Sequence, residues 1–257
     1  TTSSFQILLY TLIGIILVIA SATITNNIID RDIDRLMART QDRPLVNGDI
    51  SLITAGILAV LFAILGFYLL YFQVNTLAGN LALIGFIDYV ILYSLIFKRQ
   101  STLSILVGSI SGAVPPLVGY VAVTDQLDLN VLYLFIIFSS WQIAHSYAIA
   151  LYRKADYEKA KIPMPPLFMS LESAQKRVIF YILIMLIAVV LLIFNSFFFI
   201  ITKVLAVIVM VYWLASAMKP ISLEESTWGK KQFLNSLLII MALCFLAIID
   251  HALVFWI

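Results

Sequence analysis

The chain has 257 residues, of which 63% are hydrophobic and only 12% are charged, and its formal net charge is +2. Apolar runs of about 20 residues recur, which is the length that a helix needs to cross a bilayer. This pattern predicts an all-α, polytopic membrane protein, since a membrane barrel would show short alternating strands instead. The sequence contains no nucleotide-binding glycine motif and no basic patch for nucleic acid, and its single cysteine excludes a disulfide framework.

Eight spans are expected, with boundaries near residues 5–27, 51–72, 76–97, 103–123, 131–152, 177–195, 197–218 and 233–256. No link between them is long enough for a soluble domain, so residues 1–257 are expected to form one transmembrane domain. Every basic residue except Lys203 lies in the links after the first, third, fifth and seventh spans or, in the case of Arg177, directly at the edge of one. The positive-inside rule therefore predicts that these links are cytoplasmic and that both termini lie outside. An external N-terminus without a charged flank is unusual, so we expect one further helix before Thr1, giving nine spans.

A charged segment follows the first span and carries the strongest candidate for a site. On a helix, Asn26, Asp30 and Asp34 share one face, and Asn27 borders it. Mg²⁺ prefers few carboxylates together with substrate phosphates. Basic residues repeat beside these carboxylates at the same spacing, at Arg31, Arg35 and Arg39. The pattern predicts a metal–diphosphate site, and the alternative is a solvated helix end with intrahelical ion pairs.

The fourth span and the link after the fifth span contain small residues and prolines that affect helix packing and continuity. Ser104, Gly108 and Gly112 are small residues at four-residue spacing, which favours close helix packing. Pro115-Pro116 then predicts a kink, whose freed carbonyls must face protein or a cavity. In the link at 153–176, Pro163, Pro165 and Pro166 are expected to end any helix that continues from the fifth span. Near the C-terminus we expect a buried Cys244, and Asp250 with His251 at the membrane interface.

Among the ionisable residues inside predicted spans, Asp88 and His145 are the candidates for a functional role. Asp88 is about 15 Å of helix rise from Lys98, near mid-membrane, and is interpreted as either functional or a hydrogen-bonded structural residue. His145 lies on a polar face of the fifth span and is either a packing residue or a substrate contact. The other members of this face are Ser139, Gln142 and Ser146.

Several stretches resemble one enzyme family. The run 26–34, followed by 39–48, resembles the first aspartate-rich motif of the UbiA-type intramembrane prenyltransferases. Lys98-Arg99, the run 111–120, and the run 151–157 leading to Ile162-Pro163-Met164 are similar to the haem O synthase (protohaem IX farnesyltransferase) branch of that superfamily. Together they cover roughly residues 25 to 165 in the expected order.

The chain also departs from the family pattern. Asn27 stands where the superfamily usually has aspartate, and the second motif offers Asp156 with only Glu158 as a substitute for its partner. Ala144-His145-Ser146 replaces the usual Pro-His-Phe, and Ser104 replaces asparagine. The family's motif Ile-Pro-Met-Leu-Pro becomes Ile-Pro-Met-Pro-Pro, and the family's first helix is missing here.

The resemblance implies a helix bundle around a central cavity and a Mg²⁺-dependent reaction at the cytoplasmic face of the cell membrane, or of the inner mitochondrial membrane in a eukaryote. Farnesyl diphosphate would prenylate the 2-vinyl group of haem b, giving haem O, within the lipid bilayer. The implied metal ligands are Asn26, Asn27, Asp30, Asp34 and Asp156, of which the three aspartates are catalytic. The implied diphosphate-binding residues are Arg39, Arg43, Lys98, Arg99, Arg153 and Lys154. The implied acceptor-binding residues are Asp88, Tyr93, Gln142 and His145, with His145 contacting the haem iron or a propionate.

Two alternatives remain open. A UbiA-type enzyme of this kind can instead prenylate a quinone-ring precursor, which needs no iron ligand. A membrane transporter would use Asp88 and His145 as a polar pathway, although transporters typically show repeats or paired broken helices, and only one broken span is evident.

Overall fold

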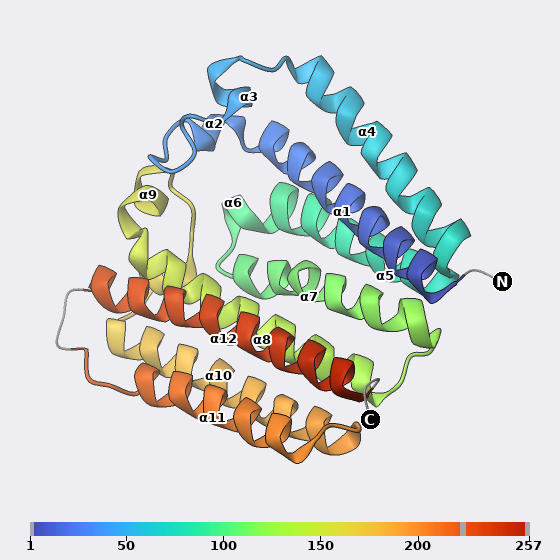
Figure 1. Cartoon of the computed structure of the whole chain (residues 1–257). Helices are drawn as coiled ribbons and strands as arrows, with labels where there is room; N and C mark the ends of the chain where they lie inside the picture. Colours follow the sequence, from blue (N-terminus) through green and yellow to red (C-terminus); the bar gives the residue numbers. More distant parts are fainter. Residues whose placement is uncertain (1–2, 222–224, 255–257) are drawn as a thin grey trace. The chain divides into compact units, whose positions relative to one another are not determined.

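A computed structural model of the chain describes residues 3–221 and 225–254. The described chain is helical and contains no strand. Its longer helices are α1 (Ser4–Ile29), α4 (Leu52–Tyr68), α5 (Thr76–Ile87), α7 (Ser104–Thr124), α8 (Leu129–Tyr152), α10 (Leu171–Asn195), α11 (Ile200–Ala217) and α12 (Glu225–Val254) (Figure 1). Within this described part, eight helices are long and apolar enough to cross a membrane, which confirms the predicted multi-pass membrane protein.

Short helices join or extend these spans. Two of them are π-helical and continue α4 and α5, namely η1 (Leu69–Val74) and η2 (Asp88–Phe97). The others are α2 (Arg31–Asp34), α3 (Pro44–Asn47), α6 (Lys98–Gln100), α9 (Lys154–Lys159) and the 3-10 turn η3 (Pro165–Phe168).

Polar residues at the edges of the apolar runs fix where several helices begin. Ser3 accepts a hydrogen bond from the Gln6 backbone and forms a capping box with the Gln6 side chain. Ser51, Asn75 and Ser170 accept the equivalent backbone bond at the starts of α4, α5 and α10. Each cap satisfies a backbone donor that has no partner within the helix.

The described chain divides into two compact units, the first running to Val131 and including Ala155–Met164. In this first unit α1 packs on α4, and α5 packs on α7. Gly66 allows the closest approach of α1 and α4, because a Cβ there would lie 2.8 Å from the Val18 side chain and 2.9 Å from the Gly14 carbonyl oxygen. The Ser21 hydroxyl also donates to the Ala59 carbonyl at 2.7 Å and fixes the register of these two helices.

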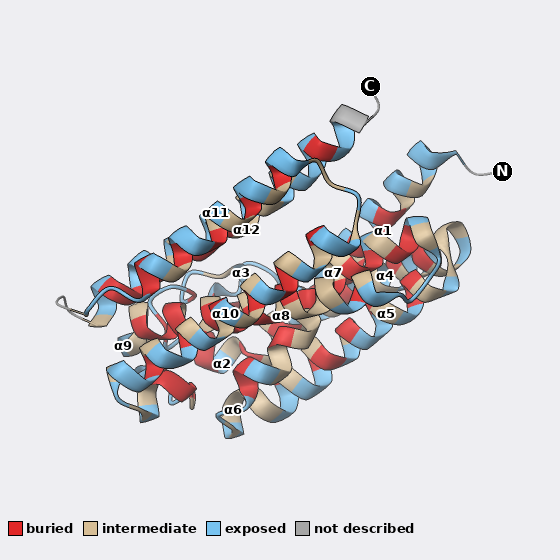
Figure 2. Ribbon diagram, turned by 90° about the horizontal axis from the view of Figure 1, so that it is seen from below, coloured by how far each residue is buried: buried red, intermediate tan, exposed pale blue. Residues whose placement is uncertain are grey.

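The second unit consists of Leu132–Lys154 and the described residues from Pro165 onwards. Here α11 packs on both α10 and α12. Gly229 brings α12 against the end of α8, since a Cβ at this position would lie 2.7 Å from the Tyr152 nitrogen. The buried residues of the long helices lie on their packing faces, and many exposed residues are large and apolar, as expected for a lipid-facing surface (Figure 2).

Some expectations about the elements need correction. Helix α10 begins at Leu171, six residues before the predicted 177, because Ser170 caps it there. Helix α7 runs from Ser104 to Thr124 with Pro115 and Pro116 inside it, in agreement with the predicted span. Cys244 is exposed, since a helix in lipid meets no penalty for turning an apolar face outward. Asp250 is buried, and its carboxylate accepts a 3.0 Å hydrogen bond from the Phe199 backbone N–H, directly before α11.

Candidate active site

The end of α1 holds the predicted oxygen donors in one row. Asp30 closes α1 through a 2.8 Å bond from its N–H to the Asn26 carbonyl, and the Asp34 N–H repeats this bond to Asp30. The helical spacing therefore continues through α2, as predicted. Asn26, Asp30 and Asp34 are all buried, and the Asn26 amide donates to the Asp30 carboxylate at 2.7 Å.

Two cations from the end of the third span meet Asp30. Lys98 makes an ion pair with its fully buried carboxylate, and Arg99 lies 3.4 Å from the other carboxylate oxygen. Arg99 also donates to the Ile29 carbonyl at 2.7 Å, which places a positive charge at the C-terminus of α1. A buried carboxylate needs such partners, because an unpaired buried charge is costly.

Arg99 is oriented by a carboxylate outside the predicted site. The two terminal nitrogens of its guanidinium donate to the two oxygens of Asp32 at 2.8 Å and 2.7 Å. This hydrogen bonding lowers the pKa of the exposed Asp32 carboxyl below its ordinary value. Asp32 therefore holds Arg99 beside Asp30 without sharing the face of the other carboxylates.

Arg43, at the end of the turns that follow α2, adds a third cation beside the carboxylates of Asp30 and Asp34. One terminal nitrogen donates to the Asn27 side-chain oxygen at 2.8 Å and to the Asp34 carboxylate at 2.5 Å. Thr40 supports this turn by donating its hydroxyl to the Asp34 carbonyl at 3.0 Å. Asp30 and Asp34 thus each face a cation that the chain itself supplies.

The predicted stripe of arginines does not form. Helix α2 ends at Asp34 and residues 35–43 run through turns, so i, i+4 spacing no longer places Arg35 and Arg39 on one helical face. Both side chains are exposed, and Arg31 instead donates to the Leu45 carbonyl at 2.7 Å. The helix ends here because its following backbone groups bond within tighter turns.

Asp156 reaches the same end of the first unit from α9. Its carboxylate accepts a 3.2 Å hydrogen bond from the Ala38 backbone N–H, in the turn that follows α2. In Figure 1, α2, α3, α6 and α9 lie together at the end away from the N-terminus. The two segments that resemble the family's first and second aspartate motifs therefore meet.

A polar path continues from this cluster into the third span. The Asn26 amide donates to the Ser94 hydroxyl at 2.9 Å, and Ser94 donates to the Tyr89 carbonyl at 2.7 Å. Tyr93 stacks on Tyr89 with ring centroids 5.6 Å apart, and the Lys98 ammonium lies 5.7 Å from the Tyr93 ring centroid. Tyr93, a predicted acceptor-binding residue, therefore lies beside Lys98, a predicted diphosphate-binding residue.

Asp88 marks the start of η2 and is almost fully buried. One carboxylate oxygen accepts a 3.0 Å bond from the Ser111 backbone N–H, and the other has no hydrogen-bond partner in the described structure. π-Helical turns frequently accompany functional sites. The contact ties Asp88 to the segment of α7 that resembles the family's Pro-Pro stretch.

The remaining predicted residues belong to the second unit. Lys154 pairs with Glu225 at 3.0 Å, and the Arg153 guanidinium lies 4.5 Å from the centre of the Tyr152 ring. Half-buried Gln142 has no hydrogen-bond partner among the described residues, whereas the Nδ1 atom of His145 lies 2.8 Å from the Ser236 hydroxyl.

Sequence reasoning missed the residues that orient the predicted ones, namely Asp32, Ser94, Glu225 and Ser236. Asp32 was detectable as a third carboxylate of the motif, two residues from Asp30 and so on another helical face. The other three had no local signal, because each meets its partner from a distant helix.

The donor set of the first unit fits a magnesium ion that also binds substrate phosphates. Two carboxylates and an asparagine lie one turn apart, and all are hard oxygen donors. Within the described residues, no group of three or more histidine, cysteine or acidic side chains is arranged to hold a metal. Mg²⁺ typically uses one or two carboxylates and completes its octahedron with water and phosphate oxygens, so a larger protein cage is not required.

Known proteins resemble this chain in sequence over most of its length. Residues 1–237 match the UbiA prenyltransferase family. The chain is 42% identical over 248 residues to a protein named protoheme IX farnesyltransferase from Citrobacter koseri, covering 96% of this chain and 84% of that one. A protein of the same name from Pectobacterium atrosepticum is 41% identical over 248 residues, again covering 96% and 84%.

Solved structures share the fold at low sequence identity. A UbiA homologue from Aeropyrum pernix K1 matches with a TM-score of 0.76 at 20% identity, covering 97% of this chain and 91% of that one. A UbiA homologue from Archaeoglobus fulgidus, described as bound to GPP and Mg²⁺, matches with a TM-score of 0.67 at 17% identity, covering 95% and 88%.

Proposed function

We propose that this chain, which belongs to the UbiA prenyltransferase family and is a prenyltransferase, transfers a farnesyl group from farnesyl diphosphate to haem b. The product is haem O, and the site faces the cytoplasm from the cell membrane. The acceptor follows from the name carried by relatives at 41–42% identity. The cytoplasmic orientation follows from the distribution of basic residues.

The observation that carries the proposal is the charge arrangement at the end of α1. Buried Asp30 and Asp34 lie one turn apart, and Lys98, Arg99 and Arg43 surround them. Acidic residues that can hold a divalent ion beside cations that can hold phosphate oxygens are what a prenyl diphosphate requires. A transporter pathway has no need for this combination.

Asp30 and Asp34 would hold Mg²⁺, with the amide oxygen of Asn26 and the Asp156 carboxylate available nearby. The ion supplies positive charge that stabilises diphosphate as a leaving group. Lys98, Arg99 and Arg43 add fixed positive charge where negative charge develops on the phosphate oxygens. The guanidinium of Arg99 is preorganised, because Asp32 and the Ile29 carbonyl already orient it.

The reaction breaks the bond between C1 of the farnesyl group and the diphosphate oxygen, and both electrons leave with the diphosphate. The terminal carbon of the haem 2-vinyl group then forms a carbon–carbon bond to farnesyl C1. Water captures the resulting cation and releases one proton, which leaves the hydroxyethyl group of haem O. Apolar spans keep bulk water from the farnesyl cation before the new bond forms.

The test incubates membranes containing the full chain with farnesyl diphosphate, Mg²⁺ and haem b, followed by extraction and mass analysis of the porphyrin. The expected product is farnesylated haem carrying one added water. A parallel incubation replaces haem b with a quinone-ring precursor. Prenylation of that ring with unchanged haem would assign the chain to the alternative enzyme class, and no transfer to either acceptor would reject a prenyltransferase of these substrates.

A further inference from the structure

Two side chains of α8 meet one buried serine of α12. The indole N–H of Trp141 donates to the Ser236 carbonyl at 2.8 Å. His145, one turn further along α8, places Nδ1 at 2.8 Å from the Ser236 hydroxyl oxygen. Both oxygens of Ser236 are therefore engaged by the same face of α8, within the second unit.

The hydrogen bonds of Ser236 determine the tautomer of His145. The Ser236 hydroxyl lies 2.6 Å from the Phe233 carbonyl, and a carbonyl oxygen only accepts. The serine proton is therefore used in that bond, so the hydroxyl oxygen must accept from His145. Nδ1 carries the imidazole proton, and the lone pair of the neutral ring lies on Nε2.

Neighbouring rings hold this imidazole in one orientation. The Trp141 ring stacks on it with a centroid distance of 5.2 Å and an interplanar angle of 26°. The Phe233 ring lies 5.0 Å from it at 40°. His145 remains half-buried, and its Nε2 has no hydrogen-bond partner among the residues described.

We infer that Nε2 of His145 is the axial ligand of the haem iron, and that Ser236 is the positioning residue that fixes its tautomer. This inference rests on the proposed haem acceptor. Histidines that bind metals use one nitrogen as ligand while the other donates a hydrogen bond to a second group. The alternative contact, a haem propionate, is disfavoured because a carboxylate needs an N–H donor, and Nε2 presents a lone pair instead.

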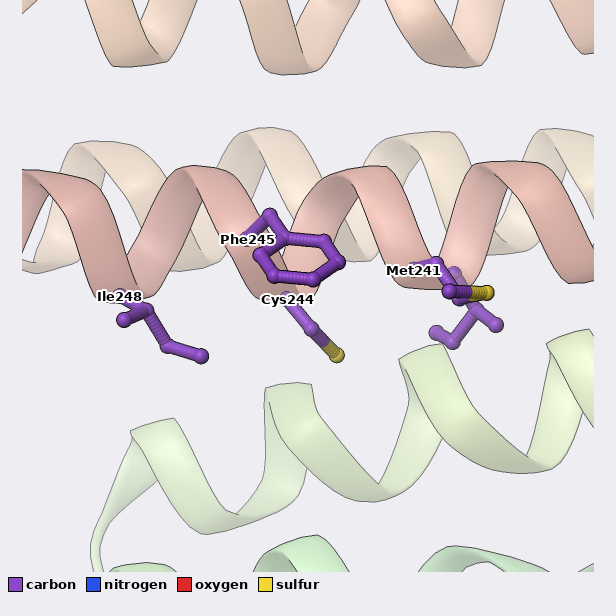
Figure 3. Close-up of a pocket in the computed structure, with 5 residues that line it drawn as sticks. Met241, Cys244, Phe245 and Ile248 are labelled. Atoms are coloured by element: carbon purple, nitrogen blue, oxygen red, sulfur yellow. The ribbon is translucent and has the colours of Figure 1, made fainter.

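The surface that continues along α12 from Ser236 is apolar. Ile240 and Cys244 follow it at successive turns and line a pocket of about 170 Å³ with Met241, Phe245 and Ile248. In Figure 3 the labelled side chains Met241, Cys244 and Ile248 project from the same side of this helix. The lining is hydrocarbon and sulfur, so this surface offers no charged group that would compete with His145 for a bound molecule.

The experiment titrates the purified full chain with ferric protohaem and, separately, with metal-free protoporphyrin. Absorption spectra follow binding, and resonance Raman spectra of the reduced complex report the iron–imidazole stretch. The variants are His145→Ala and Ser236→Ala. Ser109→Ala is the matched control, because this buried serine also donates to the carbonyl three residues earlier, at 2.7 Å, but meets no imidazole.

His145→Ala is expected to lose the iron–imidazole stretch and to regain an imidazole-ligated spectrum when free imidazole is added. Its affinity for metal-free protoporphyrin stays unchanged, which also shows that the variant folds. Ser236→Ala is expected to keep the ligand but lower the stretching frequency, and to weaken protohaem binding by about 10-fold, the usual effect of losing an orienting partner. Ser109→Ala behaves as the parent chain.

An unchanged iron–imidazole stretch in His145→Ala would overturn the inference. So would equal losses of affinity for both porphyrins, which would indicate a propionate contact. These outcomes are separate from failure of the proposed function, in which the parent chain neither binds protohaem nor farnesylates it. A parent chain that farnesylates haem while His145→Ala keeps its spectrum would reject the ligand assignment alone.

Discussion

At the scale of single residues, Asp30 and Asp34 are buried at the end of α1 and each pairs with a cation. We predict that Asp30→Asn and Asp34→Asn each reduce turnover by at least about 10²-fold, the scale of losing one electrostatic contact in a preorganised site. Insertion into the membrane should persist, since it depends on the apolar spans. Initial rates at saturating Mg²⁺, normalised to the amount of inserted protein, provide the measurement.

The exposed Asp49, in the same link, offers a matched control for this experiment. Asp49→Asn removes the same charge from a residue outside the cluster, and its turnover should equal that of the parent chain. Near-normal turnover in both Asp30→Asn and Asp34→Asn would contradict the assignment of these carboxylates to the metal–diphosphate site.

The Asp32–Arg99 pair makes stability depend on pH in a defined direction. The Arg99 guanidinium holds the pKa of the Asp32 carboxyl below its ordinary value of 3.8, so folding favours the charged form. The stabilisation is fully present above that ordinary pKa and is lost as the pH falls through the lower value of the folded state. We predict that Asp32→Asn lowers the thermal midpoint at pH 6 and that this difference shrinks below about pH 4. A difference that is constant between pH 6 and pH 3 would rule out the pair as its source.

At the scale of elements, two glycines of α4 can distinguish the effect of helix packing on stability from the effect of helix propensity. A Cβ on Gly66 would lie 2.9 Å from backbone atoms of α1, whereas a Cβ on Gly56 meets nothing within 4 Å. We predict that Gly66→Ala forces α1 and α4 apart and lowers the thermal midpoint in detergent. Gly56→Ala should leave it unchanged or raise it, because alanine favours a helix by about 1 kcal/mol over glycine. Equal effects of the two substitutions would contradict the close approach of these helices.

At the scale of the whole molecule, the distribution of charge predicts the orientation in the membrane. The links at 28–50, 98–102, 153–176 and 219–232 hold every basic residue except Lys203 and Arg177, which directly follows the third of these links, and they should be cytoplasmic. Single cysteines at Asp42, Thr102 and Lys161 should react with an impermeant reagent only from the cytoplasmic side, and one at Gln126 only from outside. Cys244 is exposed and must first be replaced by alanine. External labelling at Asp42 would place the diphosphate site on the wrong side for a cytosolic substrate.

Local sequence determined the features that depend on one helix alone. Runs of about 20 apolar residues can satisfy their backbone in lipid only as helices, so the spans followed directly. The row of Asn26, Asp30 and Asp34 followed from the helical period, because residues four apart lie one turn apart on the same face. The prediction for Arg31, Arg35 and Arg39 failed for the same reason, because the helix that it assumed ends at Asp34.

Tertiary structure decided which cations and hydroxyl groups meet these residues. Lys98 meets Asp30 across 68 positions of sequence, Asp156 meets Ala38 across 118, and His145 meets Ser236 across 91. Such partners depend on how each helix is rotated against its neighbour. Helices that are apolar on every side carry no hydrophobic stripe to specify that rotation. The rotation is set instead by close approaches, such as that of Gly66 in α4 to the backbone of α1, and by interhelical hydrogen bonds, such as that of Ser21 to Ala59. These contacts exist only once the helices have packed.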